Sequence, residues 1–108
     1  MSVHAADHWL EVEDKDGTSI VRFVIADLLH DETIDCIGEQ VRDLIQRGGC
    51  RRLVLHFGAV QRISSHMVGE LVVLLKRTLA ARGCLVLCSL SAELRDTFTL
   101  LKLGGQGA

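Results

Sequence analysis

The chain has 108 residues, 48% of them apolar, and a formal net charge of −2 with a pI near 6.2. That length suits one domain, and the apolar content predicts a buried core rather than a disordered chain. Because the basic residues are scattered and the only aromatics are one Trp and three Phe, neither a nucleic-acid surface nor a base-stacking platform is expected.

No segment approaches the roughly 20 consecutive apolar residues that cross a bilayer, and the first seven residues lack a signal-peptide pattern. We therefore expect a cytoplasmic protein with no membrane contact. The four cysteines are expected as small buried apolar side chains, because a domain of this size needs no disulfide framework. The five histidines show no paired metal-ligand spacing, and redox and nucleotide-binding motifs are absent. Neither a metal nor a cofactor is predicted.

The first predicted unit is a β-hairpin. Residues 9–13 alternate, with Leu10 and Val12 on one face, as in a half-buried strand. Residues 14–17 supply Asp and Gly for a tight reversal, and residues 19–25 resume a β-rich run. Residues 1–7 are expected as a loose N-terminus.

An amphipathic helix is predicted from Thr33 to the Gly48-Gly49 pair, where a glycine can adopt the left-handed conformation that ends a helix. Its apolar face is Ile34, Ile37, Val41, Leu44 and Ile45. The nearly continuous apolar run of residues 53–57 predicts a strand covered on both faces, with His56 as a satisfied core residue.

A second helix is predicted to begin at Ser64 or Ser65 and to run to Gly83, since serine caps free backbone N–H groups. Its inner stripe is Met67, Val68, Leu71, Val72, Leu75 and Leu79. Residues 84–88 form another short apolar strand. Ser91 then caps a third helix with an inner face of Leu94, Phe98 and Leu101, and residues 104–108 are expected as a loose Gly-rich tail.

The predicted order is ββαβαβα, so residues 1–108 are expected to form a single α/β domain. The alternation in its second half implies parallel strands with right-handed crossovers. We expect a mixed sheet of about four strands packed with helices.

The segment Ile63-Ser64-Ser65-His66-Met67-Val68-Gly69 places two hydroxyls between a strand's loop and a helix N-terminus. A phosphate there would be stabilised by free N–H groups and by the helix dipole. The alternative is that both serines are simply caps.

Residues 53–103 resemble the STAS domain of anti-sigma-factor antagonists. In that family an apolar strand leads into Asp-Ser-Ser-Gly-Leu-Gly and an apolar helix, and here the strand at 53–55 leads into residues 64–69 and the apolar helix after them. The last strand and helix resemble the family's as well. By position, Ser65 matches the phosphorylated serine, Ser64 the aspartate and Gly69 the second glycine. His66-Met67 replaces the Ser-Gly pair, and Ala26 stands where a glycine is common.

The resemblance implies an anti-sigma factor antagonist that binds an anti-sigma factor, a serine-protein kinase of the histidine-kinase-like ATPase type, and is released when Ser65 is phosphorylated. Ser64 is the second choice as phosphoacceptor. The domain would be a substrate, not an enzyme, and would regulate sigma-factor-dependent transcription. Its partner-binding surface is predicted to include Asp27, His30, Asp31, Ser64, Ser65, His66 and Gly69.

Other interpretations stay open beside this one. A STAS-like domain that no longer switches could act as a scaffold in a larger regulatory complex, and loss of the motif aspartate favours it. A small serine hydrolase is a remote alternative, because His66 adjoins Ser65 and cannot readily serve as its base. A phosphoaspartate receiver would need an aspartate where residues 56–58 are His-Phe-Gly. The sequence leaves a homo-oligomer open.

Overall fold

The computed structural model describes residues 2–5, 9–47 and 52–100, and these form one α/β unit. Five strands make a mixed sheet in the order β1-β2-β3-β5-β7. Its strands are β1 (Ser2–Ala5), β2 (Leu10–Lys15), β3 (Thr18–Phe23), β5 (Arg52–His56) and β7 (Cys84–Cys88). The first three are antiparallel, and β3, β5 and β7 are parallel. The mixed sheet is as predicted, with β1 added to the four expected strands where a loose N-terminus was expected.

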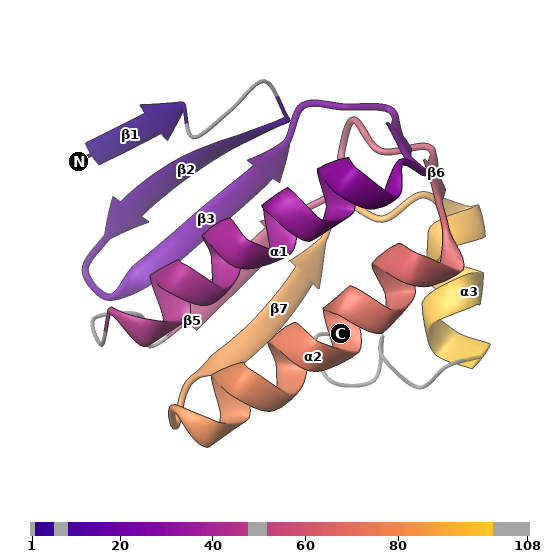
Figure 1. Ribbon diagram of the computed structural model, residues 1–108. Helices are drawn as coiled ribbons and strands as arrows, with labels where there is room; N and C mark the ends of the chain where they lie inside the picture. Colours follow the sequence, from indigo (N-terminus) through magenta and orange to yellow (C-terminus); the bar gives the residue numbers. More distant parts are fainter. Residues whose placement is uncertain (1, 6–8, 48–51, 101–108) are drawn as a thin grey trace.

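Three helices accompany the sheet: α1 (Asp31–Gln46), α2 (Ser65–Ala80) and α3 (Ala92–Leu100). Helices α1 and α2 lie side by side on one face, and α3 lies at the end of the sheet toward which the parallel strands point (Figure 1). Two short strands, β4 (Asp27–Leu28) and β6 (Arg62–Ile63), form a separate parallel pair. None of the helices in the described residues is long and apolar enough to cross a membrane.

The hairpin between β2 and β3 closes on Asp16 and Gly17, whose φ angles are 51° and 83°. Lys15 pairs with Thr18, so the loop has two residues. Two consecutive positive φ values define the turn that matches the twist of antiparallel strands, and an Asp-Gly pair adopts it at little cost. The predicted hairpin is therefore confirmed, with its reversal at the second half of the Asp14–Gly17 segment.

The core lies between the sheet and the helices. In β3, β5 and β7 the alternate residues Val21, Leu55 and Leu87 are register partners on the helix side, and Val21 and Leu55 are fully buried. Their neighbours on the opposite face, Val54 among them, are half-exposed. The expectation that β5 is covered on both faces is therefore wrong, because the helices pack on one side only.

An aromatic chain ties α3 to the sheet. The ring of Phe57, which follows β5, lies 5.0 Å from that of Phe23 and 5.8 Å from that of Phe98, measured between centroids. All three side chains are fully buried. Ser91 caps α3 as predicted, since its Oγ accepts a hydrogen bond from Leu94 N at 3.2 Å. Leu101 and the predicted loose tail lie outside the described residues.

The helix boundaries differ from those predicted. Helix α1 begins at Asp31, two residues before Thr33, because Asp31 and Glu32 form its first turn, where acidic side chains favour the positive end of the helix dipole. It ends at Gln46, and the glycines at 48 and 49 lie outside the described residues. Helix α2 ends at Ala80, and Arg82, with a φ of 63°, adopts the left-handed conformation before Gly83.

The cysteines also differ from expectation. Cys84 is exposed, while Cys36 and Cys88 are half-buried, and all three carry free thiols. Cys84 lies at the start of an edge strand and Cys88 faces away from the helices, which explains their exposure. Cys50 lies outside the described residues.

The inner face of α2 was predicted in part: Leu79 was included wrongly, and the buried Leu74 and Thr78 were left out. Leu74 is fully buried, whereas Leu79 is 53% exposed. The buried positions Met67, Leu71, Leu74 and Thr78 follow the 3.6-residue repeat, and residue 79 is rotated about 100° away from that line.

Leu74→Ala is expected to lower the free energy of unfolding by about 2–5 kcal/mol, because it leaves a cavity in a packed core. Leu79→Ala, the matched control on the same helix, should change it by about 0.5 kcal/mol or less. Urea denaturation of both variants measures the difference. Equal losses would contradict the burial of Leu74 and the exposure of Leu79.

Candidate functional site

The candidate site lies where the loop after β3 and the loop before α2 are joined through the short strands β4 and β6. Ala26 O accepts hydrogen bonds from Gln61 N at 2.7 Å and from Arg62 N at 3.1 Å, and Ser64 N donates to Leu28 O at 3.0 Å. The loop after β3 and the loop before α2 are therefore held together by backbone bonds. This contact was missed by the sequence analysis, because two-residue strands have no detectable periodicity.

Ser64 and Ser65 have different environments. Ser64 is the N-cap of α2, half-buried, and its Oγ accepts a hydrogen bond from Met67 N at 3.2 Å. Ser65 is the first residue of α2 and is exposed. The hydroxyl at residue 64 thus has a structural role, and the one at residue 65 is presented to solvent.

Gly69 lies one helical turn after Ser65, on the same side of α2. It is exposed, and a Cβ placed there would have no atom of this chain within 4 Å. Neither packing nor backbone conformation within the described part of the chain therefore requires a glycine at this position.

His66 connects α2 to α1. Its Nε2 lies 2.7 Å from Asp35 Oδ1, and both side chains are partly exposed. The hydrogen bond to Asp35 raises the pKa of His66 above its ordinary value. Desolvation opposes this shift in part, and the negative charges of Asp35, Asp31 and Glu70 support it.

Farther along the same helix pair, Glu70 bonds to Arg42 of α1. The Glu70 carboxylate lies over Gly38, and a Cβ at residue 38 would meet it. The glycine thus leaves room for this position of the carboxylate, and a larger residue there would require the flexible end of the Glu70 side chain to shift.

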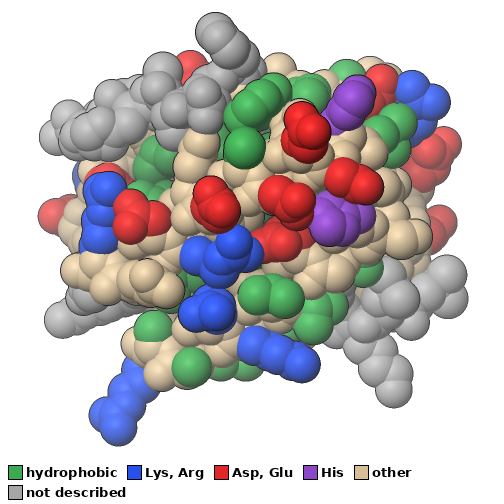
Figure 2. Space-filling model, in the orientation of Figure 1, with side chains coloured by type: hydrophobic (Ala, Val, Ile, Leu, Met, Phe, Trp, Pro, Cys, Tyr) green, Lys and Arg blue, Asp and Glu red, His purple; other side chains and the backbone are tan. Residues whose placement is uncertain are grey.

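The predicted surface residues lie along this end of the fold. Asp27 is in β4, His30 is the N-cap residue of α1, and Asp31 opens α1. His30 makes no side-chain capping bond. Asp31 contributes to the negative potential at His66, so the start of α1 and the start of α2 are electrostatically connected. Figure 2 shows acidic side chains and histidines gathered along α1 on this face.

Asp27 has a partner that the sequence did not reveal. Arg62 Nε and Nη2 donate to its two carboxylate oxygens at 3.0 and 2.9 Å, and the two residues are register partners across β4 and β6. These hydrogen bonds hold the pKa of the Asp27 carboxyl below its ordinary value. Because 35 residues separate them, only the strand pairing brings the two side chains together.

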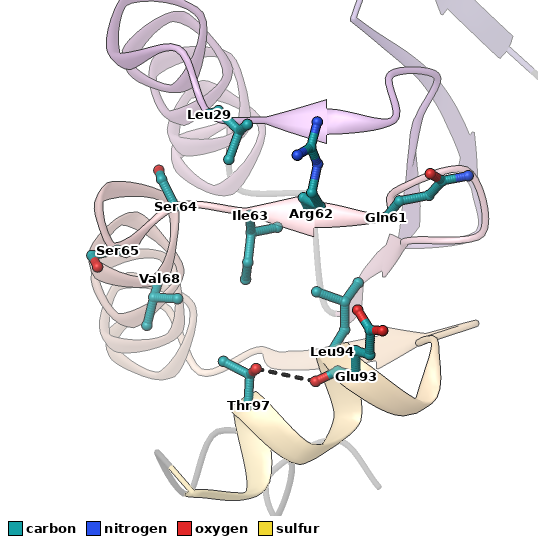
Figure 3. A pocket seen from close by; sticks show the side chains of 10 residues that line it. All are labelled: Leu29, Gln61, Arg62, Ile63, Ser64, Ser65, Val68, Glu93, Leu94 and Thr97. Carbon is teal, nitrogen blue, oxygen red and sulfur yellow. Dashed lines mark hydrogen bonds between the residues drawn. The ribbon is translucent and has the colours of Figure 1, made fainter.

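A groove of about 540 Å³ opens between this loop pair and α3. In Figure 3, Ile63, Val68 and Leu94 point into the space between α2 and α3, while Arg62 points toward β4. The groove is lined by Leu29, Gln61, Arg62, Ile63, Ser64, Ser65, Val68, Glu93, Leu94 and Thr97. Ser65 thus stands at the edge of a hollow with an apolar floor.

A histidine–serine contact lies at the end of β5, between His56 and Ser89. Gly58 N donates to His56 Nδ1 at 3.2 Å, so in the neutral ring the proton is on Nε2, which donates to Ser89 Oγ at 3.1 Å. A base for Ser89 would need an unprotonated Nε2. The arrangement fixes the loop after β5 and does not activate a nucleophile. His56 is satisfied, as predicted, although half-buried.

The pairing of Asp27 with Arg62 is testable by NMR. A carboxyl whose pKa is depressed in the folded state contributes stability above its unfolded pKa and loses it as pH falls through the folded value. The titration midpoint of Asp27 is therefore expected below about 3.9, the ordinary value for Asp. Arg62→Gln should return it to that value, and an unchanged midpoint would contradict the ion pair.

The chain was compared with protein families, with curated proteins and with solved structures. The sequence profile of the STAS domain matches residues 10–105. No curated protein matches the chain.

Among solved structures, the Bacillus cell fate determinant SpoIIAA in its phosphorylated form is similar, with 20% identity, a TM-score of 0.76, and coverage of 92% of this chain and 88% of that one. A putative anti-sigma factor antagonist from Thermotoga maritima has 21% identity, a TM-score of 0.76, and coverage of 93% and 84%. A STAS domain protein from Planctomyces limnophilus has 18% identity, a TM-score of 0.77, and coverage of 91% and 86%.

Proposed function

Since this chain belongs to the STAS domain family, we propose that it is an anti-sigma factor antagonist that regulates sigma-factor-dependent transcription and is switched by phosphorylation of Ser65. Its partner in this proposal is an anti-sigma factor that is also a serine-protein kinase of the histidine-kinase-like ATPase type. The domain is the substrate and competitor, acts in the cytoplasm, and catalyses no reaction itself.

The exposure of Ser65 is the observation that carries this proposal. Ser64, its neighbour, is half-buried and engaged in the N-cap bond to Met67 N. Ser65 is exposed at the first position of a 16-residue helix and needs no rearrangement of α2 to reach a kinase. The kinase would transfer the γ-phosphoryl group of ATP to Ser65 Oγ, which loses its proton, and ADP would leave.

A phosphate at residue 65 would be compatible with the fold. The free N–H groups and the positive dipole end of α2 stabilise an anion there, so the domain stays folded when modified. The partner would then meet a surface with up to two additional negative charges. At an interface fitted to the neutral serine, such a charge weakens binding by repulsion or by incomplete solvation.

Two serine variants distinguish the serine that accepts the phosphate from the serine that caps α2. Ser65→Ala is expected to abolish phosphate transfer by the cognate kinase with little change in stability. Ser64→Ala should leave the acceptor in place but lower the free energy of unfolding by about 0.5–2 kcal/mol, because the N-cap bond is lost. Mass spectrometry after incubation with kinase and ATP, and urea denaturation, measure the two effects.

Transfer that persists in Ser65→Ala and disappears in Ser64→Ala would instead make Ser64 the acceptor. The phosphorylated wild type should also bind the kinase more weakly than the unmodified protein. Tight binding by both forms would contradict the switch.

Gly69 provides a probe of the partner surface that does not disturb folding. Gly69→Ala is expected to stabilise the protein by up to about 1 kcal/mol, because an exposed glycine within a helix is unfavourable relative to alanine. If α2 contacts the partner here, the added methyl should weaken binding of the kinase.

Calorimetric titration with the kinase measures that loss, and Ala80→Gly, at the opposite end of α2, is a control for helix propensity alone. Unchanged affinity in Gly69→Ala would remove residue 69 from the interface.

A second candidate function is a non-switching STAS scaffold. The cap bond from Met67 N to Ser64 favours it, because a helix-capping role explains a hydroxyl in place of the motif aspartate. A scaffold would bind its partner equally well in wild type and Ser65→Ala, with no transfer to either serine. A serine hydrolase gains no support, because His66 adjoins Ser65 in sequence and cannot readily serve as its base, and because His56 carries its proton on the nitrogen that faces Ser89.

A further inference from the structure

His66 is the titratable side chain nearest in sequence to Ser65, and its position is fixed from the other helix. Asp35 Oδ1 lies 2.7 Å from its Nε2, so the ring is held at the junction of α1 and α2 beside the first turn of α2. Successive helix residues point about 100° apart. A charge on residue 65 is therefore expected to act on His66 through space, from the adjacent position on α2.

The surroundings of His66 are mainly acidic. Helix α1 contributes Asp31 and Asp35, and α2 contributes Glu70. The charge of Glu70 is offset by Arg42 of α1, whereas Asp31 is exposed. Histidine is the side chain whose charge changes nearest to neutral pH, and the contact with Asp35 raises the pKa of His66 above its ordinary value, which favours the protonated ring among these carboxylates.

We propose that His66 couples proton binding to the charge on residue 65, so that a phosphate on Ser65 and a proton on His66 stabilise each other. This coupling deepens the proposed function and rests on it for the phosphate itself.

The direction follows from the neighbouring charges. A proton on His66 places a cation one residue from the phosphate and partly offsets the charges of Asp31 and Asp35. With His66 neutral, the phosphate adds to the negative charge around the start of α2 without that compensation. Linkage is reciprocal, so acidification favours the phosphorylated form and a rise in pH favours the unmodified serine.

The coupling can be measured without a kinase. Ser65→Asp and Ser65→Asn have nearly the same shape and differ by one negative charge. The Cε1–H resonance of His66, assigned by its loss in His66→Gln, is followed by NMR in each variant between about pH 5 and pH 9. The titration midpoint is expected about 0.3 pH units higher in Ser65→Asp, which is a two-fold increase in proton affinity.

Equal midpoints in Ser65→Asp and Ser65→Asn would overturn the coupling. A difference that shrinks at about 1 M salt would support it, since exposed charges are screened there. If either variant fails to fold, Ser65→Glu and Ser65→Gln make the same comparison. Asp35→Asn should lower the midpoint of His66 in each background, which checks the contact with α1.

The proposed function can fail separately from this coupling. If the kinase transfers no phosphate to Ser65, the proposed function fails, but the NMR difference between Ser65→Asp and Ser65→Asn can still be observed. If the two midpoints are equal, the coupling fails, but Ser65 can still be phosphorylated.

Discussion

The backbone pairing between β4 and β6 is the constraint on which the rest of the site depends. Ala26 O binds two successive N–H groups of the other loop, and Ser64 N binds Leu28 O. These bonds fix where α2 begins relative to α1, because Ser64 is both the last residue of that contact and the N-cap of the helix. The position of Ser65 in space is therefore set by Ala26 and Leu28, which lie more than 30 positions before it in the sequence.

Because the start of α2 is fixed, the adjacent side chains of residues 64, 65 and 66 have different contacts. The hydroxyl of residue 64 satisfies a backbone donor, and the hydroxyl of residue 65 is left to solvent. The ring of residue 66 reaches across to Asp35 on α1. Ser64 thus caps the helix, Ser65 is exposed on the surface, and His66 joins α2 to α1. In this domain of the STAS family, the side chain of Ser65 is left exposed while the packing of α2 stays undisturbed.

The fold was predictable because its main elements have strong local patterns. Apolar alternation in β2 and β3, the Asp-Gly turn and the helical spacing in α1 each report a periodicity set by the backbone. Leu79 was misplaced because an apolar side chain at the end of a helix fits two adjacent stripes, and only the path of α2 over the sheet decides between them. The edge strand β1 was missed because residues 2–5 alternate over only four positions, with a single β-branched side chain among them, which does not distinguish a strand from a loose end.

The candidate site was predictable only in part. Ser64, Ser65 and Gly69 were identified through the family pattern, and the capping role of a serine at 64 or 65 followed from residue type alone. The partners Arg62 of Asp27 and Asp35 of His66 were not, since each pair is more than 30 residues apart and depends on strand register or on how two helices meet. Local rules describe elements, whereas contacts between elements require the assembled structure.

The contact of Glu70 with Gly38 and Arg42 has a consequence for substitutions between α1 and α2. A side chain at residue 38 would take space that the Glu70 carboxylate occupies, so the end of that flexible side chain would have to shift. Loss of Arg42 would leave a mostly buried acid without its counter-ion. A substitution at one of these three positions is therefore expected to change the effect of a substitution at another.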